Sequence, residues 1–247
     1  MKKIVGAAFI FSIFVSCASS QNLNKLLKGI NKKDSSVRAN NQSINGSLST
    51  DEVAGGLKEA LNAGVQKGTQ QLSAVNGFFA NAAIKILLPP EAQKVENTLR
   101  SVGLGKQVDD AILSMNRAAE DATKSAAPIF LNAIKQMTIQ DAWAILRDGD
   151  TSATHYLRAK TTVSLTSAFS PVIQQSLQKV NATKYWNTLF TTYNQMPFVQ
   201  KVNPDLTAYV TGKALDGIFY EIGLQEKDIR KNPVARTTDL LKKVFGQ

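Results

Sequence analysis

Apolar residues recur at helical spacing through most of the chain. Leu57 and Leu61 open a stripe in which apolar residues fall every four positions, which places them on one face of a helix. Ser49 lies before this stripe, and Glu52 follows Ser49 by three residues. This spacing is typical of the capping box at a helix N-terminus. The pattern predicts a helix that begins near Thr50.

Proline and glycine divide the rest of the chain into further helical segments. Pro128 is expected to start a new helix or to kink the preceding one. Pro89-Pro90 ends a short apolar run whose backbone can adopt an extended conformation but cannot continue as a helix. The segments expected to be helical cover about residues 91–102, 108–128, 129–137, 139–147, 151–180, 184–195, 205–231 and 234–245.

The segment 151–180 fits two patterns. Val163, Leu165 and Phe169 are separated by even numbers of residues, so they would lie on the same side of a strand. Leu165 and Phe169 are four residues apart and also share one face of a helix. Because no other segment offers a partner strand, we interpret it as a helix that is broken at Pro171.

The N-terminus has the pattern of a secretory signal. Lys2 and Lys3 precede an apolar run from Ile4 to Val15. This run is too short for a bilayer span, which needs about 20 residues, but it has the length of the apolar core of a signal peptide. Residues 1–16 are therefore interpreted as a signal peptide.

Cys17 is the only cysteine of the chain and ends a motif, Phe14-Val15-Ser16-Cys17, that resembles the lipobox of bacterial lipoproteins. In that motif the cysteine is acylated and becomes the new N-terminus, and its acyl chains anchor the protein to a bilayer. Ala18 differs from the Asp that often marks inner-membrane retention, so the resemblance favours the periplasmic face of the outer membrane over the inner membrane. The alternatives are a plain signal peptide cleaved near Ala18 or Ser19, and retention in the cytosol.

Residues 17–50 are rich in serine and asparagine and carry an excess of positive charge. This composition is typical of a flexible arm. Beside a lipid anchor, the basic side chains of such an arm would attract anionic headgroups. The composition fits a solvated linker, without membrane contact, equally well. The lysines expected to face the membrane are Lys25, Lys28, Lys32 and Lys33.

Composition narrows the class of protein. The chain is 43% hydrophobic, which is too apolar for a disordered protein, and residues 51–247 are expected to form a single all-α domain of several helices after the signal peptide and the arm. Lys and Arg total 29 against 19 Asp and Glu, an excess that would suggest nucleic acid, but export argues against such a partner. One Cys and one His exclude a Cys/His metal site, and no motif for a cofactor occurs.

Several polar side chains on the expected helices are candidates for a ligand site or for structural contacts. Asn116, Arg117 and Glu120 are three or four residues apart and can lie on adjacent ridges of one helix. A buried carboxylate in such a group could anchor a ligand or act as an acid or base, although pairing across helices is the more common role. Arg117 and Arg158 are candidate partners for Asp216.

Several stretches of sequence occur in a distinctive order. They are Gly56-Leu57-Lys58-Glu59-Ala60-Leu61, Met115-Asn116-Arg117-Ala118-Ala119-Glu120, Asp141-Ala142, Ala153-Thr154 with Tyr156, Tyr209-Val210-Thr211, Lys213-Ala214-Leu215-Asp216-Gly217-Ile218-Phe219, and Ile229-Arg230-Lys231-Asn232-Pro233 followed by Leu241-Lys242-Lys243-Val244-Phe245-Gly246. Together they resemble the bacterial DUF4197 family over about residues 49–246, with Asn76 in place of an Asp as one departure. The resemblance implies an all-helical domain behind a lipoprotein-type or secretory signal and no established activity. It adds Asp141, Tyr156 and Arg230 to the candidate positions.

Two functions fit these observations. The first is a non-enzymatic envelope lipoprotein whose helical domain binds an apolar or amphiphilic ligand or a partner protein. The alternative is a hydrolase or lyase that uses Glu120 or Asp216 together with Arg117. His155 is not assigned a catalytic role, because the chain lacks the Gly-x-Ser-x-Gly motif that would supply a nucleophile.

Overall fold

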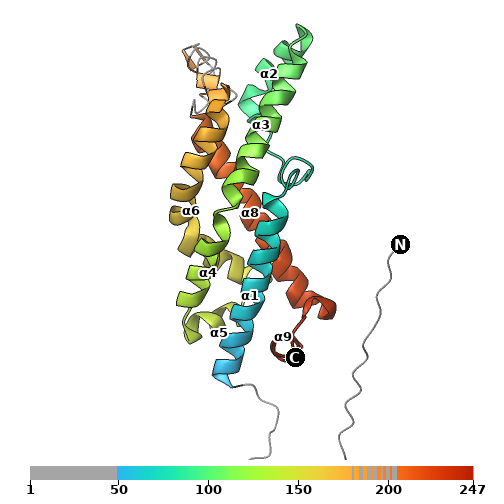
Figure 1. Ribbon diagram of the computed structural model, residues 1–247, viewed down its shortest axis with the longest axis vertical. Coiled ribbons are helices and arrows are strands. Elements are labelled where there is room, and N and C mark those ends of the chain that lie inside the picture. The colour runs from blue at the N-terminus through green and yellow to red at the C-terminus, as the bar shows by residue number, and fades with distance from the viewer. Residues whose placement is uncertain are drawn as a thin grey trace, which may run out of the picture. The chain divides into compact units, whose positions relative to one another are not determined.

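Figure 1 shows the computed structural model. The structure describes residues 49–179, 181–183, 186, 187, 191, 194, 195, 197, 198, 201 and 205–246, all of which belong to one compact unit, Gly46–Gln247. The expected signal peptide, Cys17 and the expected basic arm up to residue 48 lie outside the described residues, as does most of the helix expected at 184–195. Every regular element in the described part is helical, which confirms the all-α class.

The helices follow the expected segments closely. In chain order they are α1 (Thr50–Ser73), the 3₁₀ turn η1 (Pro90–Ala92), α2 (Gln93–Ser101), α3 (Gly105–Thr123), α4 (Ala126–Gln136), α5 (Ile139–Arg147), α6 (Ser152–Lys179), α8 (Leu206–Lys231), the 3₁₀ turn η2 (Pro233–Ala235) and α9 (Asp239–Phe245).

The first helix begins with the expected capping box. Ser49 Oγ accepts the N–H of Glu52 at 3.2 Å, and Glu52 Oε2 accepts the N–H of Ser49 at 2.9 Å. Helix α1 packs along α8, and α9 also packs against α1 (Figure 1). A Cβ added at Gly64 or Gly68 would lie 3.4 Å from the nearest side chain of α8, so the small residues permit the close approach of the two helices.

The core is built around α6, which packs against α3, α8 and α4. Leu165 and Phe169 are fully buried, whereas Val163 is 80% exposed, which is the pattern of a helix and excludes the strand alternative. Phe130 on α4 meets Phe219 on α8 edge to face, with ring centres 5.7 Å apart. None of the described helices combines the length and the apolar character needed to cross a bilayer.

The expected break at Pro171 is wrong, because α6 continues through this residue. Pro171 is exposed, so water can hydrate the carbonyl group that loses its helical partner. Phe169 and Ile173 on either side are fully buried, and their packing holds the helix together.

Two boundaries also differ from the expectation. α3 ends at Thr123 and α4 begins at Ala126, so Pro128 lies in the first turn of a new helix, where a missing N–H costs little. The segment expected as one helix from residue 234 is divided into η2 and α9, because Thr238 Oγ1 accepts the N–H of Leu241 at 3.2 Å and starts a separate helix.

Candidate functional site

Residues 74–89, called the 74–89 loop, connect α1 to η1 without a regular helix. Gly77 closes a turn by donating its N–H to Ala74 O at 2.9 Å, and Asn76 has a left-handed φ of 71°. A Cβ at Gly77 would collide with the carbonyl oxygen of Leu72, so glycine is required here. Loops of this length without a helix or strand of their own are uncommon in a compact domain and are often functional.

Three side chains of α3 hold this loop and are called the loop cluster: Asn116, Arg117 and Glu120. Glu120 Oε1 accepts the backbone N–H groups of Phe78 and Phe79 at 3.1 and 3.2 Å. Its Oε2 accepts Arg117 Nη1 at 2.6 Å, and the Glu120 side chain is only 5% exposed. One buried carboxylate therefore satisfies two loop amides and is itself neutralised by a guanidinium.

Asn116 and Tyr209 hold the second half of the loop. Asn116 is fully buried, accepts the N–H of Ile86 at 2.8 Å and donates its amide to Ile86 O at 2.8 Å. The hydroxyl of Tyr209 on α8 donates to Leu87 O at 2.8 Å. Burial, with a smaller effect of the Glu91 charge, raises the pKa of Tyr209 to about 12, so this hydroxyl keeps its proton above the pH at which an ordinary tyrosine ionises.

Phe78 fixes the loop to the core from the opposite direction. Its side chain is fully buried and lies against Gly217 of α8, where an added Cβ would come within 2.5 Å of the ring. Gly217 belongs to one of the sequence motifs, and close packing with the loop explains why glycine occupies this position.

The outer side of the loop is hollowed. An open depression of about 440 Å³ is lined by Asn76, Phe79, Ala80, Ala82 and Lys85. Two cations lie near the half-buried Phe79: Lys85 Nζ is 4.0 Å and Arg117 Cζ is 6.0 Å from the ring centre. Arg117 also donates Nη2 to Asn76 Oδ1 at 2.8 Å, which ties the rim of the depression to the loop cluster.

A second group of polar side chains lies where α5 is followed by α6. We call it the corner cluster, and its members are Ser152, Thr154, Glu226 and Arg230. Glu226 Oε1 accepts the N–H of Ala153 at 3.0 Å, and its Oε2 accepts the N–H and the hydroxyl of Thr154 at 2.8 and 2.7 Å. The first N–H groups of a helix lack partners within the helix, so Glu226 caps α6 from α8.

Arg230 completes the corner cluster, four residues after Glu226 on α8. Its Nε and Nη2 donate to Glu226 Oε1 at 3.0 and 2.9 Å, and Nη2 also reaches Ile145 O and Ser152 Oγ at 2.9 Å. Ile145 lies in the last turn of α5, where a carbonyl has no helical partner. The Arg230 side chain is 12% exposed, so this ion pair is more enclosed than that of the loop cluster.

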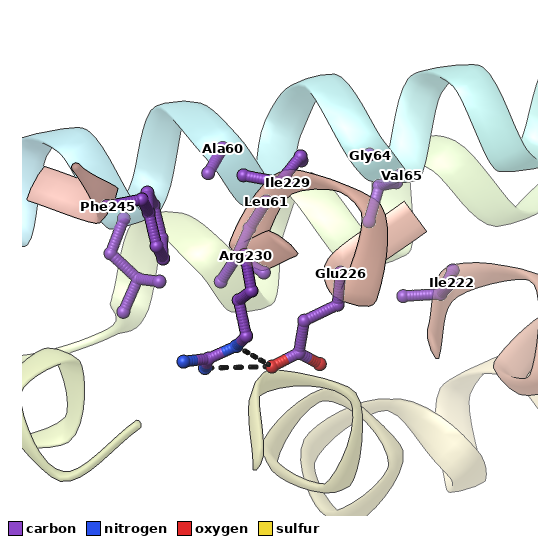
Figure 2. A pocket seen from close by; sticks show the side chains of 10 residues that line it. Ala60, Leu61, Gly64, Val65, Ile222, Glu226, Ile229, Arg230 and Phe245 are labelled. Carbon is purple, nitrogen blue, oxygen red and sulfur yellow. Dashed lines mark hydrogen bonds and ion pairs between the residues drawn. The ribbon is translucent and has the colours of Figure 1, made fainter. Parts of the chain in front are cut away.

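An apolar cavity lies next to the corner cluster, between α1, α8 and α9. Figure 2 shows Glu226 and Arg230 at one side and the ring of Phe245 at another. The cavity measures about 20 Å³, which is room for about one water molecule. It is therefore a packing void beneath α9 that is too small to receive an apolar ligand.

The remaining predicted positions lie elsewhere on the helices. Asp141 forms a capping box with Thr138, whose backbone N–H and hydroxyl donate to Oδ2 at 2.9 and 2.7 Å, and these bonds lower the pKa of Asp141. Arg158 pairs with Asp216 at 3.3 Å and lies over the ring of Phe219 at 4.4 Å. Asp216 has no hydrogen bond or ion pair with the loop cluster among the described residues.

Tyr156 and His155 lie near the start of α6. Tyr156 is partly buried against the core, which raises its pKa, and Lys160 Nζ is 5.6 Å from its ring centre. His155 is exposed. In the described part of the chain, no group of His, Cys, Asp and Glu residues could hold a metal ion.

Comparison with known families decides the relationship that the motifs suggested. A family described as a protein of unknown function, DUF4197, matches residues 47–246. The chain belongs to the DUF4197 family. No curated protein and no solved structure matches the chain.

In this DUF4197 domain, the sequence motifs coincide with the two polar clusters. The motif 115–120 contains the whole loop cluster, and Arg230 and Thr154 come from two further motifs. Glu226, Tyr209 and Lys85 were not among the predicted site residues. The signal that could have found Glu226 is its spacing of four residues from Arg230, which allows the two to pair on one helix, but no sequence signal links Tyr209 or Lys85 to the loop.

Proposed function

We propose that this DUF4197 domain is a non-enzymatic interaction module, held at the cell envelope by a lipid anchor, that presents the 74–89 loop to a partner protein. The observation that carries the proposal is the use of Glu120. Its carboxylate is bound by two loop amides and by Arg117, so its charge serves to fix the loop. Loops fixed by a rigid scaffold are the usual carriers of recognition.

The two hollows of the domain favour a partner protein over an enclosed apolar ligand. The cavity beside Glu226 has a volume of about 20 Å³, whereas ligand pockets measure roughly 300–1,000 Å³. The depression on the loop reaches about 440 Å³ but is open to solvent. An open hollow suits side chains that protrude from another protein, because it does not have to enclose its ligand.

The hydrolase or lyase alternative gains no support from the geometry. That alternative needs Glu120 or Asp216 to face a substrate together with Arg117. Glu120 is 5% exposed and bound on both oxygens, and Asp216 pairs with Arg158 on the neighbouring helix. An acid or base at Glu120 would first have to give up bonds that hold the loop.

The anchor is the second part of the proposal. The lipobox-like motif supports acylation of Cys17, and Lys25, Lys28, Lys32 and Lys33 would add attraction to anionic headgroups on the periplasmic face of the outer membrane. Mass spectrometry of the peptide that contains Cys17, from protein purified out of the envelope, is expected to show the acyl chains. An unmodified thiol would contradict the anchor.

The interaction role is tested by crosslinking in living cells with the full chain. A photoreactive amino acid replaces Ala82, which is exposed and lines the depression, and in a control chain it replaces Ala63, which is exposed on α1. We expect a discrete crosslinked protein from position 82 and none from position 63. Equal products from both positions, or no product from position 82, would contradict a docking role for the loop.

A further inference from the structure

We infer that the depression on the 74–89 loop recognises a carboxylate that lies next to an apolar side chain, that is, an acidic and apolar segment of the partner protein. This inference rests on the proposed function and names the chemistry of its partner. The carboxylate would face Lys85 and Arg117, and the apolar side chain would lie against Phe79.

Lys85 supplies the charge. Its Nζ is 4.0 Å from the centre of the Phe79 ring, and it forms no ion pair with any described residue. The backbone beneath it is fixed on both sides, because Lys85 N–H donates to Asn81 O at 2.8 Å and the next residue, Ile86, is held by Asn116. The backbone that carries this side chain is thus held in place and the ammonium group rests against the Phe79 ring, which limits the entropy lost on binding.

Arg117 supplies geometry more than charge. Its Nη1 and Nη2 are bound to Glu120 and Asn76, which orient the guanidinium beside the depression, and its Nε has no partner among the described residues. The side chain remains 37% exposed. Because Glu120 neutralises Arg117, the site as a whole has about one uncompensated positive charge, which matches a single carboxylate better than a doubly charged phosphate.

The shape of the site favours a protein over a membrane surface. Ala80 and Ala82 line the hollow with small side chains, beside Asn76, Phe79 and Lys85. A concave hollow of this kind receives a protruding side chain, whereas a bilayer offers a broad surface. The Phe79 ring and the Lys85 cation beside it provide both apolar contact and attraction for an anion.

The test uses the full chain labelled for NMR and a defined probe. The probe is an acetylated and amidated hexapeptide of alternating leucine and glutamate, and the matched control peptide has glutamine in place of every glutamate. Titration of the acidic peptide is expected to shift the amide resonances of Ala80 and Ala82, and the glutamine peptide is expected to bind at least about 3-fold more weakly. Equal binding of the two peptides would overturn the inference.

Variants assign the effect to the site. Lys85→Gln is expected to weaken the binding of the acidic peptide about 3-fold, while Lys227→Gln, which removes an exposed cation on α8, leaves it unchanged. An unchanged affinity in Lys85→Gln would contradict the inference. Vesicles that contain anionic lipid serve as the other arm, and stronger shifts of Ala82 with vesicles than with the acidic peptide would reassign the hollow to lipid headgroups.

The same variant separates this inference from the proposed function. If the crosslink from position 82 persists at full yield in a Lys85→Gln chain, the partner docks on the loop by other chemistry, so the inference fails and the proposed function stands. If the acidic peptide binds as expected but position 82 yields no crosslinked protein in cells, the chemistry stands and the proposed function fails.

Discussion

The loop cluster and the corner cluster are both built on a buried glutamate that is paired with an arginine, but they hold different parts of the chain. In each, a buried glutamate on a helix accepts two backbone N–H groups from a distant segment, and an arginine one turn away on the same helix neutralises it. Glu120 holds an irregular loop in this way, whereas Glu226 caps the start of α6.

The two clusters differ in what surrounds them. Arg230 is 12% exposed and its cluster adjoins a cavity of about 20 Å³, whereas Arg117 is 37% exposed and adjoins the depression of about 440 Å³. The corner cluster is thus enclosed, and its hydrogen bonds join α5, α6 and α8. The loop cluster leaves part of its cation at the surface, so the same bonds also shape a surface that another molecule can reach.

The largest expected effect comes from the enclosed cluster. Glu226→Ala leaves Arg230 buried without its partner and two N–H groups of α6 without an acceptor, so we expect a loss of about 3–5 kcal/mol in the free energy of unfolding. Urea denaturation measures it, with Asp110→Ala, at an exposed ion pair with Lys106, as a control that should change little. A loss no greater than that of the control would show that the corner cluster does not stabilise the fold.

Glu120→Ala is expected to cost less, about 2–3 kcal/mol, because Arg117 is exposed enough to be hydrated and the partly buried N–H of Phe79 can turn towards water. The loss should be accompanied by faster proteolytic cleavage within the 74–89 loop and by unchanged protection of α6. If Glu120→Ala destabilises the protein more than Glu226→Ala does, the proposed difference between the two clusters is wrong.

Asn116→Ala sharpens the comparison within the loop. It removes both hydrogen bonds to Ile86 from a fully buried position, for which we expect a loss of about 1–2 kcal/mol. Hydrogen exchange should accelerate at the Ile86 amide while the Phe78 amide, held by Glu120, stays protected. Simultaneous loss of protection at both amides would mean that the loop opens as one unit.

The smallest effect is expected at Tyr209. Tyr209→Phe removes the hydroxyl bond to Leu87 O and should cost about 0.5–1 kcal/mol. Burial raises the pKa of Tyr209 to about 12, so its contribution is present below the ordinary tyrosine pKa near 10 and is lost as the pH rises from there towards 12. Absorbance near 295 nm should show a phenol that titrates near pH 12 in the native protein, and the amplitude at that pH should fall in Tyr209→Phe.

Local patterns were enough to predict most of the described helices and the starts that carry a capping box. The capping boxes at Ser49 and Thr138 join residues three positions apart, so the sequence contained all of the information. Pro171 shows the opposite case, since its effect depended on whether it faced solvent. That depends on the packing of α6 against other helices, which a local pattern does not contain.

The candidate site was predicted only as far as single helices extend. Asn116, Arg117 and Glu120 were placed together because they share a helix, but their partners lie 30 to 42 residues away. Glu226 and Thr154 are 72 residues apart, and their hydrogen bond depends on how α6 packs against α8. Contacts at such separations follow from the tertiary arrangement, so the 74–89 loop and its depression could not be derived from spacing.

The cap that α8 supplies to α6 also bears on the order in which this protein folds. Glu226 is synthesised more than 70 residues after the helix start that it satisfies, and α1, the first described helix, packs against α8 and α9 at the other end of the chain. Contacts of such long range close late, because the chain loses more entropy in forming them. A nascent chain that ends before residue 226 therefore lacks the group that completes α6, and it should remain unfolded and sensitive to protease until the C-terminal helices have been made.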